Sequence, residues 1–402
     1  MYEVAPLLDD PIHNLKTIRD LYRWAVTEME NANLTYGHGS PTSTEDASFL
    51  ICRALKLPFE RFDMFLDAAL THNELVRLVH LIDRRVHDKT PTAYLLKEAW
   101  LTGHRFYIDE RALIPRSYIA ELLEEDLAPW IEDPEAVESV LDLCTGSGCL
   151  AILAKGSFPN AAVTGSDISA DALEVAKINR RDYDLDDALE LVQGDLYENL
   201  QGRKFDVIIS NPPYVTTRSM DALPAEYRHE PALALAAGDD GMDVVERIVS
   251  EAADHLTENG ILIVEVGDGL EAVEALFPDL PITWLSVSGA TTRCSSRTQR
   301  TFANISATDA SVALASRFPL QRFPSFSDAP TTQSRAHARD ARSLFQGEPH
   351  CEPGRAHRPR RPQRLRQVDA LCGYFGRPLA RRRRNRNAAQ GSDRARCAEL
   401  QG

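Results

Sequence analysis

Between about residues 14 and 90, apolar side chains recur at the spacing of an α-helix. One helical face consists of Leu15, Ile18, Leu21, Tyr22 and Ala25, and a second consists of Leu75, Leu78, Val79 and Ile82. Residues three and four positions apart share one side of a helix, whereas a half-buried strand alternates at every second residue. Few stretches of this region alternate in that way. The pattern therefore predicts a small helical domain over residues 1–98.

A different pattern begins at residue 99. Residues 100–109 read Trp-Leu-Thr-Gly-His-Arg-Phe-Tyr-Ile-Asp and are rich in the aromatic and β-branched side chains that strands favour. We expect a short hairpin here, within a segment of residues 99–135 that joins the helical domain to the rest of the chain.

From Val140 onward, apolar runs of strand length alternate with helical patterns. The predicted strands are Ser139–Leu143, Ala162–Ser166, Leu189–Gln193, Phe205–Ser210 and Ile261–Val266. Strands that alternate with helices form βαβ units, whose strands lie parallel. Residues 136–289 are therefore predicted to form an α/β domain with a doubly wound, mostly parallel sheet of the Rossmann-like kind.

The charge of the chain changes sign near residue 290. The chain has 402 residues, 43% of them hydrophobic, which is enough for two domains. Residues 290–402 hold 22 of the 45 basic side chains, all arginine, and only 8 of the 60 acidic ones, so the formal charge is about −29 before residue 290 and +14 after it. An acidic body argues against a nucleic-acid site, which needs a basic surface for phosphates. It suits a basic protein partner.

The sequence gives little support to a membrane protein, a secreted protein or a metal-binding protein. No apolar run reaches the length that spans a membrane, and the first residues lack the basic and apolar segments of a signal peptide, so we expect a cytoplasmic protein. Cys52, Cys144 and Cys149 of the body do not have the paired spacing of a zinc site. Reduced thiols and no metal are expected, and nothing in the sequence indicates the oligomeric state.

Polar residues follow each of the first three predicted strands. The first strand continues as Asp142-Leu-Cys-Thr145-Gly146-Ser-Gly148, the second ends at Asp167, and Asp195 follows the third. Glycines let the backbone approach a ligand, and Asp142 suits a cationic amino-acid group better than a pyrophosphate. An acid about twenty residues after such a loop binds ribose hydroxyls, and Asp195 is placed for an adenine amine. Each acid alone could be a helix cap, but three in order make caps alone an insufficient explanation.

The segment Asn211-Pro212-Pro213-Tyr214 follows the fourth predicted strand, at the sheet edge where open α/β folds bind ligands. Two prolines fix the backbone and remove two N–H donors, which leaves the Asn211 side-chain oxygen and the Pro212 carbonyl as acceptors for one planar amino group. Tyr214 can stack on that plane. A purely structural Pro-Pro turn is the simpler alternative for this segment taken alone.

This tetrapeptide, with the ordered acids, resembles the S-adenosylmethionine-dependent methyltransferases that act on amide or adenine nitrogen. Further segments resemble the protein N5-glutamine methyltransferases, and specifically the group acting on the third protein of the large ribosomal subunit: residues 36–39 (Tyr-Gly-His-Gly), 106–111, 114–117 (Ile-Pro-Arg-Ser) and 223–231. The sister group acts on peptide-chain release factors, and its Ile-Pro-Arg segment continues differently. We read His38 and His229 as structural.

The resemblance implies S-adenosylmethionine as methyl donor, bound by Asp142, Thr145, Gly146, Gly148, Asp167, Asp195 and Asn211, and catalysis by Asn211, Pro212, Pro213 and Tyr214. It implies a glutamine of a large-subunit ribosomal protein as acceptor. A release factor as acceptor remains an alternative, as does a ribosome-assembly binding module without activity. An adenine methyltransferase ranks lower, because residues 212–289 contain only three arginines and no lysine.

Residues 290–402 pose a separate question. Their arginine content fits an RNA-binding arm. The alternative is out-of-frame translation: shifting residues 290–296 by one nucleotide under G/C-rich codons permits Gly-Asp-Asp-Ala-Val-Phe-Val, a plausible terminal strand. Residues 354–370, read in the remaining frame, permit a phosphate-binding loop of a neighbouring ATPase gene. We therefore predict that residues 290–402 are a disordered, Arg-rich tail without a domain of its own, produced by out-of-frame translation.

Overall fold

The computed structural model describes residues 6–285, 304–306 and 309–315. Residues 6–96 are helical, with one 3-10 helix, Phe59–Phe65, and five α-helices: α1 (Pro6–Asn14), α2 (Ile18–Asn31), α3 (Ser43–Ala54), α4 (His72–His87) and α5 (Thr92–Leu96). Thr17 and Thr71 cap α2 and α4, and an acid three residues later completes a capping box in both. The periodic apolar faces of the helices, Leu21 and Leu78 among them, form one buried cluster.

A two-stranded antiparallel ribbon follows the helices. Strand β1 (Ala99–Leu101) pairs with β2 (His104–Phe106), which is the hairpin that the aromatic and β-branched run predicts. The chain then continues through α6 (Ile119–Glu124) and the 3-10 helix Pro134–Ala136 into the main sheet.

The main sheet contains the five predicted strands in the order β5-β4-β3-β6-β7, all parallel. Their bounds are β3 (Ser139–Leu143), β4 (Ala162–Asp167), β5 (Leu189–Gln193), β6 (Phe205–Ser210) and β7 (Leu256–Glu265). Strand β7 begins five residues before the apolar run that predicted it. The chain runs outward from β3 to β5 and then returns to the other side of β3 with β6, so the strand order reverses between β3 and β6. In doubly wound sheets, ligands bind at this reversal.

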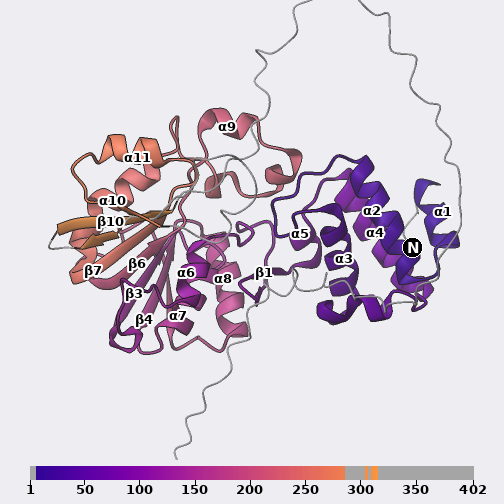
Figure 1. The fold of residues 1–402 in the computed structure, drawn as a ribbon, viewed down its shortest axis with the longest axis horizontal. Coiled ribbons are helices and arrows are strands. Elements are labelled where there is room, and N and C mark those ends of the chain that lie inside the picture. The colour runs from indigo at the N-terminus through magenta and orange to yellow at the C-terminus, as the bar shows by residue number, and fades with distance from the viewer. Residues whose placement is uncertain (1–5, 286–303, 307–308, 316–402) are drawn as a thin grey trace, which may run out of the picture. The chain divides into compact units, whose positions relative to one another are not determined.

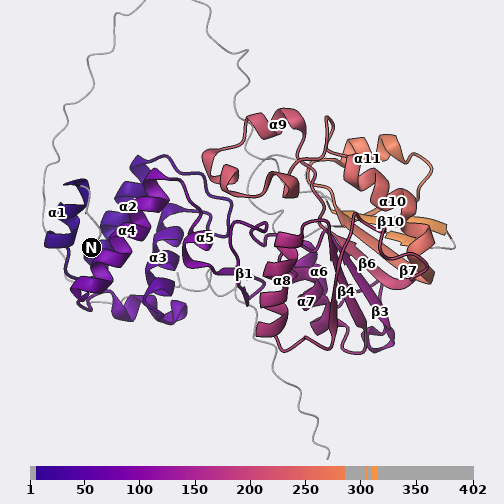
Figure 2. The ribbon, with the colours of Figure 1, turned by 180° about the vertical axis from the view of Figure 1, so that it is seen from behind.

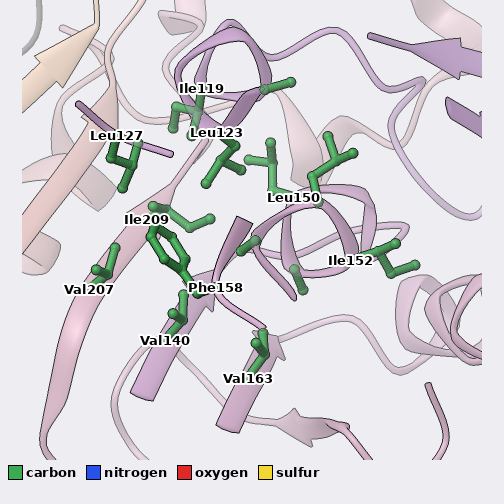
Figure 3. Packing of buried hydrophobic residues seen from close by; sticks show 14 of the residues in the cluster. Ile119, Leu123, Leu127, Val140, Leu150, Ile152, Phe158, Val163, Val207 and Ile209 are labelled. Carbon is green, nitrogen blue, oxygen red and sulfur yellow. The ribbon is translucent and has the colours of Figure 1, made fainter. Parts of the chain in front are cut away.

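Helices cover both faces of the sheet (Figure 1, and from behind in Figure 2). The helices packed on it are α7 (Cys149–Ser157), α8 (Ala170–Asp182), α10 (Asp243–His255) and α11 (Leu270–Leu276). The segment after β6 adds α9 (Thr217–Asp221) and the 3-10 helices Ala225–His229 and Ala232–Ala234. One core lies between the sheet and helices α6 and α7, and Figure 3 shows Phe158 there among Val140, Val163 and Ile209. A second core lies on the opposite face against α10 and α11. Because successive residues of a strand point to opposite faces, β6 contributes to both cores.

Two short segments within residues 290–402 join the sheet. Strand β10 (Asp309–Ala315) pairs in parallel with β7 and with β8 (Thr283–Trp284), and β9 (Asn304–Ser306) pairs antiparallel with β10. The edge of β7 offers unpaired backbone groups, and a short run of small and β-branched residues suffices to pair with it. The codon-based predictions for residues 290–303 and 354–370 lie outside the described residues.

Among the described residues, no helix is long and apolar enough to cross a membrane. The three cysteines of this part of the chain, Cys52, Cys144 and Cys149, are free thiols.

Candidate active site

The loop between β3 and α7 turns sharply at the carboxyl edge of the sheet. Cys144, Gly146 and Gly148 all have positive φ, at 58°, 54° and 78°. Gly148 is needed for a second reason, since a Cβ there would lie 3.1 Å from the Cβ of Ala176 in α8. The loop therefore presents main-chain atoms, with little side-chain bulk, to whatever binds above the sheet.

Asp142, near the end of β3, is fully buried. Its Oδ2 accepts hydrogen bonds from the Thr145 hydroxyl at 2.5 Å and from the Ala151 amide at 3.0 Å. Its Oδ1 is buried and has no hydrogen-bond partner in the described part of the chain. Burial, together with the negative charge of Asp167, raises the pKa of Asp142 to about 7. A buried, unpaired carboxylate oxygen favours a ligand group that is a cationic hydrogen-bond donor, such as an ammonium.

Asp167 ends β4 and supports the same loop. Its two carboxylate oxygens accept the Gly146 amide and the Ser169 amide, both at 2.8 Å. Burial raises the pKa of Asp167, although both amide bonds favour the charged form. Because each carboxylate oxygen can accept two hydrogen bonds, a ligand hydroxyl can still bind here.

Asp195 lies where the sequence places it, two residues after β5, but with a partner that the sequence did not reveal. Arg247 of α10 donates to both of its oxygens, each at 3.0 Å, and both side chains are about half exposed. The pair sits at the rim of the site. A ligand amino group that binds Asp195 would share the carboxylate with the Arg247 guanidinium.

The Asn211–Tyr214 segment begins where β6 ends. The Ser210 hydroxyl donates to the Leu143 carbonyl at 2.8 Å, so the segment and the glycine loop leave two adjacent strands side by side. The Oδ1 atom of Asn211 is buried and has no hydrogen-bond partner among the described residues. Pro212 is buried and Pro213 is half-buried. An unpaired amide oxygen of this kind is where an N–H donor from a ligand is expected.

Tyr214 is held by a residue that the sequence reading passed over. Its hydroxyl donates to Oε1 of Glu265 at 3.3 Å, and Glu265 is the last residue of β7 and fully buried. The signal was available, because Glu265 is an acid at the end of an apolar strand, as Asp142 is.

The segments 34–39 and 223–231 meet at a buried ion-pair cluster of five charged side chains, Asp46, Arg85, Arg116, Glu226 and Glu230, with the His38 ring 3.5 Å from Glu230. Glu226 also accepts the Thr35 amide at 2.8 Å. Burial alone would raise the pKa of Glu230, but Arg116 lowers it to about 2.

Burial lowers the pKa of His38, which fits a neutral, structural ring. His229 is not part of the cluster; its Nε2 lies 2.8 Å from the Asp88 carbonyl. Residues 226–230, which follow the Asn211–Tyr214 segment, thus contact the N-terminal helical region through ion pairs and hydrogen bonds. Both histidines have structural contacts, so neither needs a chemical role.

The parallel sheet, the glycine loop and the acids at the strand ends define an S-adenosylmethionine-dependent methyltransferase, and residues 122–226 match the family described as methyltransferase small domain. Two curated relatives are ribosomal protein uL3 glutamine methyltransferases of Burkholderia pseudomallei and Bordetella pertussis. They are 52% and 53% identical over 280 and 274 residues, which is 68% of this chain in both cases and 91% and 92% of the relatives. A relative of the same name from Francisella tularensis is 46% identical, over 69% of this chain and 88% of its own length. The chain belongs to this family of protein glutamine methyltransferases.

Proposed function

We propose that this protein transfers a methyl group from S-adenosylmethionine to the side-chain amide nitrogen of a glutamine in ribosomal protein uL3. The observation that carries the proposal is the buried, unpaired Oδ1 of Asn211 beside the glycine loop, at the point where the strand order reverses. The names of the relatives, which include uL3 and glutamine, support the choice of acceptor.

The residues that follow the strands fit the donor group by group. The free oxygen of Asp142 suits the ammonium of its methionine part, with Thr145 fixing the carboxylate. Asp167, which also accepts the Gly146 amide, suits the ribose hydroxyls. The glycines of the loop let its backbone approach the donor without steric hindrance. Asp195, held by Arg247, suits the adenine amine at the rim. The donor supplies an electrophilic methyl group on a sulfonium.

The residues of the Asn211–Tyr214 segment compensate for the weak nucleophilicity of the glutamine amide nitrogen. An amide nitrogen shares its lone pair with the carbonyl, so it attacks poorly unless it is oriented and polarised. Asn211 Oδ1 and the Pro212 carbonyl accept hydrogen bonds from the two N–H groups of this amide. These bonds stabilise the positive charge that develops on the nitrogen. Tyr214 stacks on the amide plane, and Pro213 keeps the segment rigid. The protonated product amide is acidic enough to lose its proton to water.

The acidic surface also fits this acceptor. Residues 1–289 carry a formal charge of about −29, which attracts a basic ribosomal protein and repels nucleic acid. We infer a protein acceptor bound directly.

The test is transfer of radiolabelled methyl from the donor to purified uL3 and, separately, to release factors. Wild type should label uL3 in preference, with mass spectrometry placing the methyl on a glutamine. Asn211→Ala should lower kcat by about 10²–10³-fold, the effect of removing one transition-state hydrogen-bond partner, and leave donor affinity nearly intact. Asn160→Ala, an exposed asparagine before β4 at the opposite edge of the sheet, is the matched control and should behave as wild type.

The outcomes separate the alternatives. Stronger labelling of release factors would assign the protein to the sister activity. A protein that binds uL3 but neither the donor nor its demethylated product would be a binding module without catalysis. An Asn211→Ala variant with the wild-type rate would remove the proposed role of this side chain.

A further inference from the structure

A buried carboxylate beside the acceptor segment has no role in the function proposed above. Glu265 is fully buried at the end of β7. Strands β6 and β7 are parallel, with Ser210 opposite Val264, so Asn211 and Glu265 are the next residues along two neighbouring strands. Burying a carboxylate is costly unless hydrogen bonds compensate for the lost water.

One oxygen of Glu265 is fixed by the segment before α6. Its Oε2 accepts the Ser117 hydroxyl at 2.7 Å and the Tyr118 amide at 3.1 Å. The Ser117 hydroxyl oxygen is in turn fixed, because it accepts the Ile119 amide at 3.2 Å. Two donors on Oε2 set the orientation of the carboxylate, so Oε1 has a defined direction. In that direction lies the Tyr214 hydroxyl, which donates to it at 3.3 Å.

The Tyr214 ring is confined from another side by a glycine. A Cβ at Gly267 would lie 2.8 Å from two ring carbons, and Gly267 has a φ of 57°, so only glycine is accommodated. A Cβ at Gly241 would lie 2.5 Å from the Tyr214 carbonyl oxygen. The backbone, the ring face and the hydroxyl of Tyr214 therefore each have a fixed neighbour.

We infer that Glu265 is a positioning residue, which holds the Tyr214 ring in the plane that stacks on the acceptor amide. The inference rests on the proposed function, because the amide is the group that the ring orients. Small errors in the placement of reacting groups lower rates steeply, and a ring free to rotate about its side-chain bonds would leave the amide nitrogen out of line with the methyl group.

A purely structural role for Glu265 gives different expectations. In that case the carboxylate only joins Ser117 and Tyr118 to β7, its loss lowers stability, and the Tyr214 hydroxyl does not matter for the rate. The positioning role requires that Glu265 and the Tyr214 hydroxyl act on the same step, so that their effects on kcat are coupled.

The experiment is a double-mutant cycle in the full chain, with kcat measured at saturating donor and uL3 and with donor affinity measured by calorimetry. Tyr214→Phe keeps the ring and removes the hydroxyl, and Glu265→Leu removes the carboxylate that accepts the hydrogen bond of this hydroxyl. Each should lower kcat about tenfold to hundredfold, the size of one hydrogen bond to a charged group, with donor affinity unchanged. The double variant should be no slower than the slower single variant. Glu265→Gln can still bond both Ser117 and Tyr214 and should recover most of the rate.

Tyr183→Phe is the matched control, because this hydroxyl bonds the Arg105 carbonyl at 2.9 Å, outside the site, and its loss should leave kcat unchanged. An unchanged kcat in Tyr214→Phe, or losses that multiply in the double variant, would overturn the inference. Should Glu265→Leu not fold, Tyr214→Phe against Tyr183→Phe still decides. Wild type that labels no uL3 would instead refute the proposed function.

Discussion

Replacing Asp142 by asparagine should stabilise the fold above neutral pH and weaken donor binding in the same variant. Asparagine has nearly the same shape and keeps one oxygen for the Thr145 hydroxyl and the Ala151 amide. It removes the negative charge from a fully buried position. It also places an amino group where the unpaired Oδ1 lies.

The magnitude follows from the pKa of Asp142, which burial, aided by the charge of Asp167, raises from 3.8 to about 7. A shift of about three pKa units, at about 1.4 kcal/mol each, makes ionisation of the folded protein cost on the order of 4 kcal/mol. The unfolded chain releases this proton first, so wild type loses the stability as pH rises from about 4 to about 7. The unpaired amino group in the variant costs about 1–3 kcal/mol. A net gain on the order of 1–3 kcal/mol should remain at alkaline pH.

The assay is urea unfolding of wild type and Asp142→Asn between about pH 5 and 9 at constant ionic strength. The difference in free energy of unfolding should grow with pH and level off above about pH 8. Calorimetry at alkaline pH should show donor affinity lower by about tenfold to hundredfold, because the ammonium loses one charged hydrogen-bond partner. Asp187→Asn, an exposed aspartate after α8, is the control and should change neither quantity. A stability difference independent of pH, or unchanged donor affinity, would refute the reasoning.

Three further predictions concern other parts of the chain. Asp167→Ala should weaken donor binding in calorimetry while kcat at saturating donor changes little; the reverse pattern would contradict a ribose-binding role. Arg85→Ala leaves two buried carboxylates without their arginine and should cost about 3–5 kcal/mol in urea unfolding. Arg19→Ala, which breaks an exposed pair, should cost far less, and equal costs would argue against a buried cluster. A chain with the frame restored after Gly289 should melt at a higher temperature than the 402-residue chain, and equal melting with a protease-resistant tail would favour an RNA-binding arm.

The sequence predicted the strands well because their signal is local. Strands β3, β5 and β6 lie where the apolar runs place them. Strands β3 and β6 are buried on both faces, and such a strand reads as a short continuous apolar run with polar residues at its end. The same ends revealed Asp142, Asp167 and the Asn211–Tyr214 segment. Glu265 carries this signal too and was missed only because no motif surrounds it.

Contacts between distant parts of the chain could not be predicted in this way. Arg247 lies 52 residues from Asp195, and no periodicity connects them. The charges of the buried ion-pair cluster come from four separate segments of the chain, and each charge alone resembles an ordinary surface residue in the sequence. The pairing of β10 with β7 depends on a free sheet edge, which is a property of the folded sheet and not of the residues that join it.

The buried ion-pair cluster has a consequence for the synthesis of the chain. The Thr35 amide and the Glu226 carboxylate that accepts its hydrogen bond are 191 residues apart. While the ribosome makes the chain from its N-terminus, the first helices emerge long before Glu226 and Glu230 exist. Of its two acidic partners, Arg85 has Asp46 but lacks Glu226 during this interval, and His38 lacks the acid that lies beside it in the finished protein. The N-terminal helical region is therefore completed only when residues 226–230 have left the ribosome.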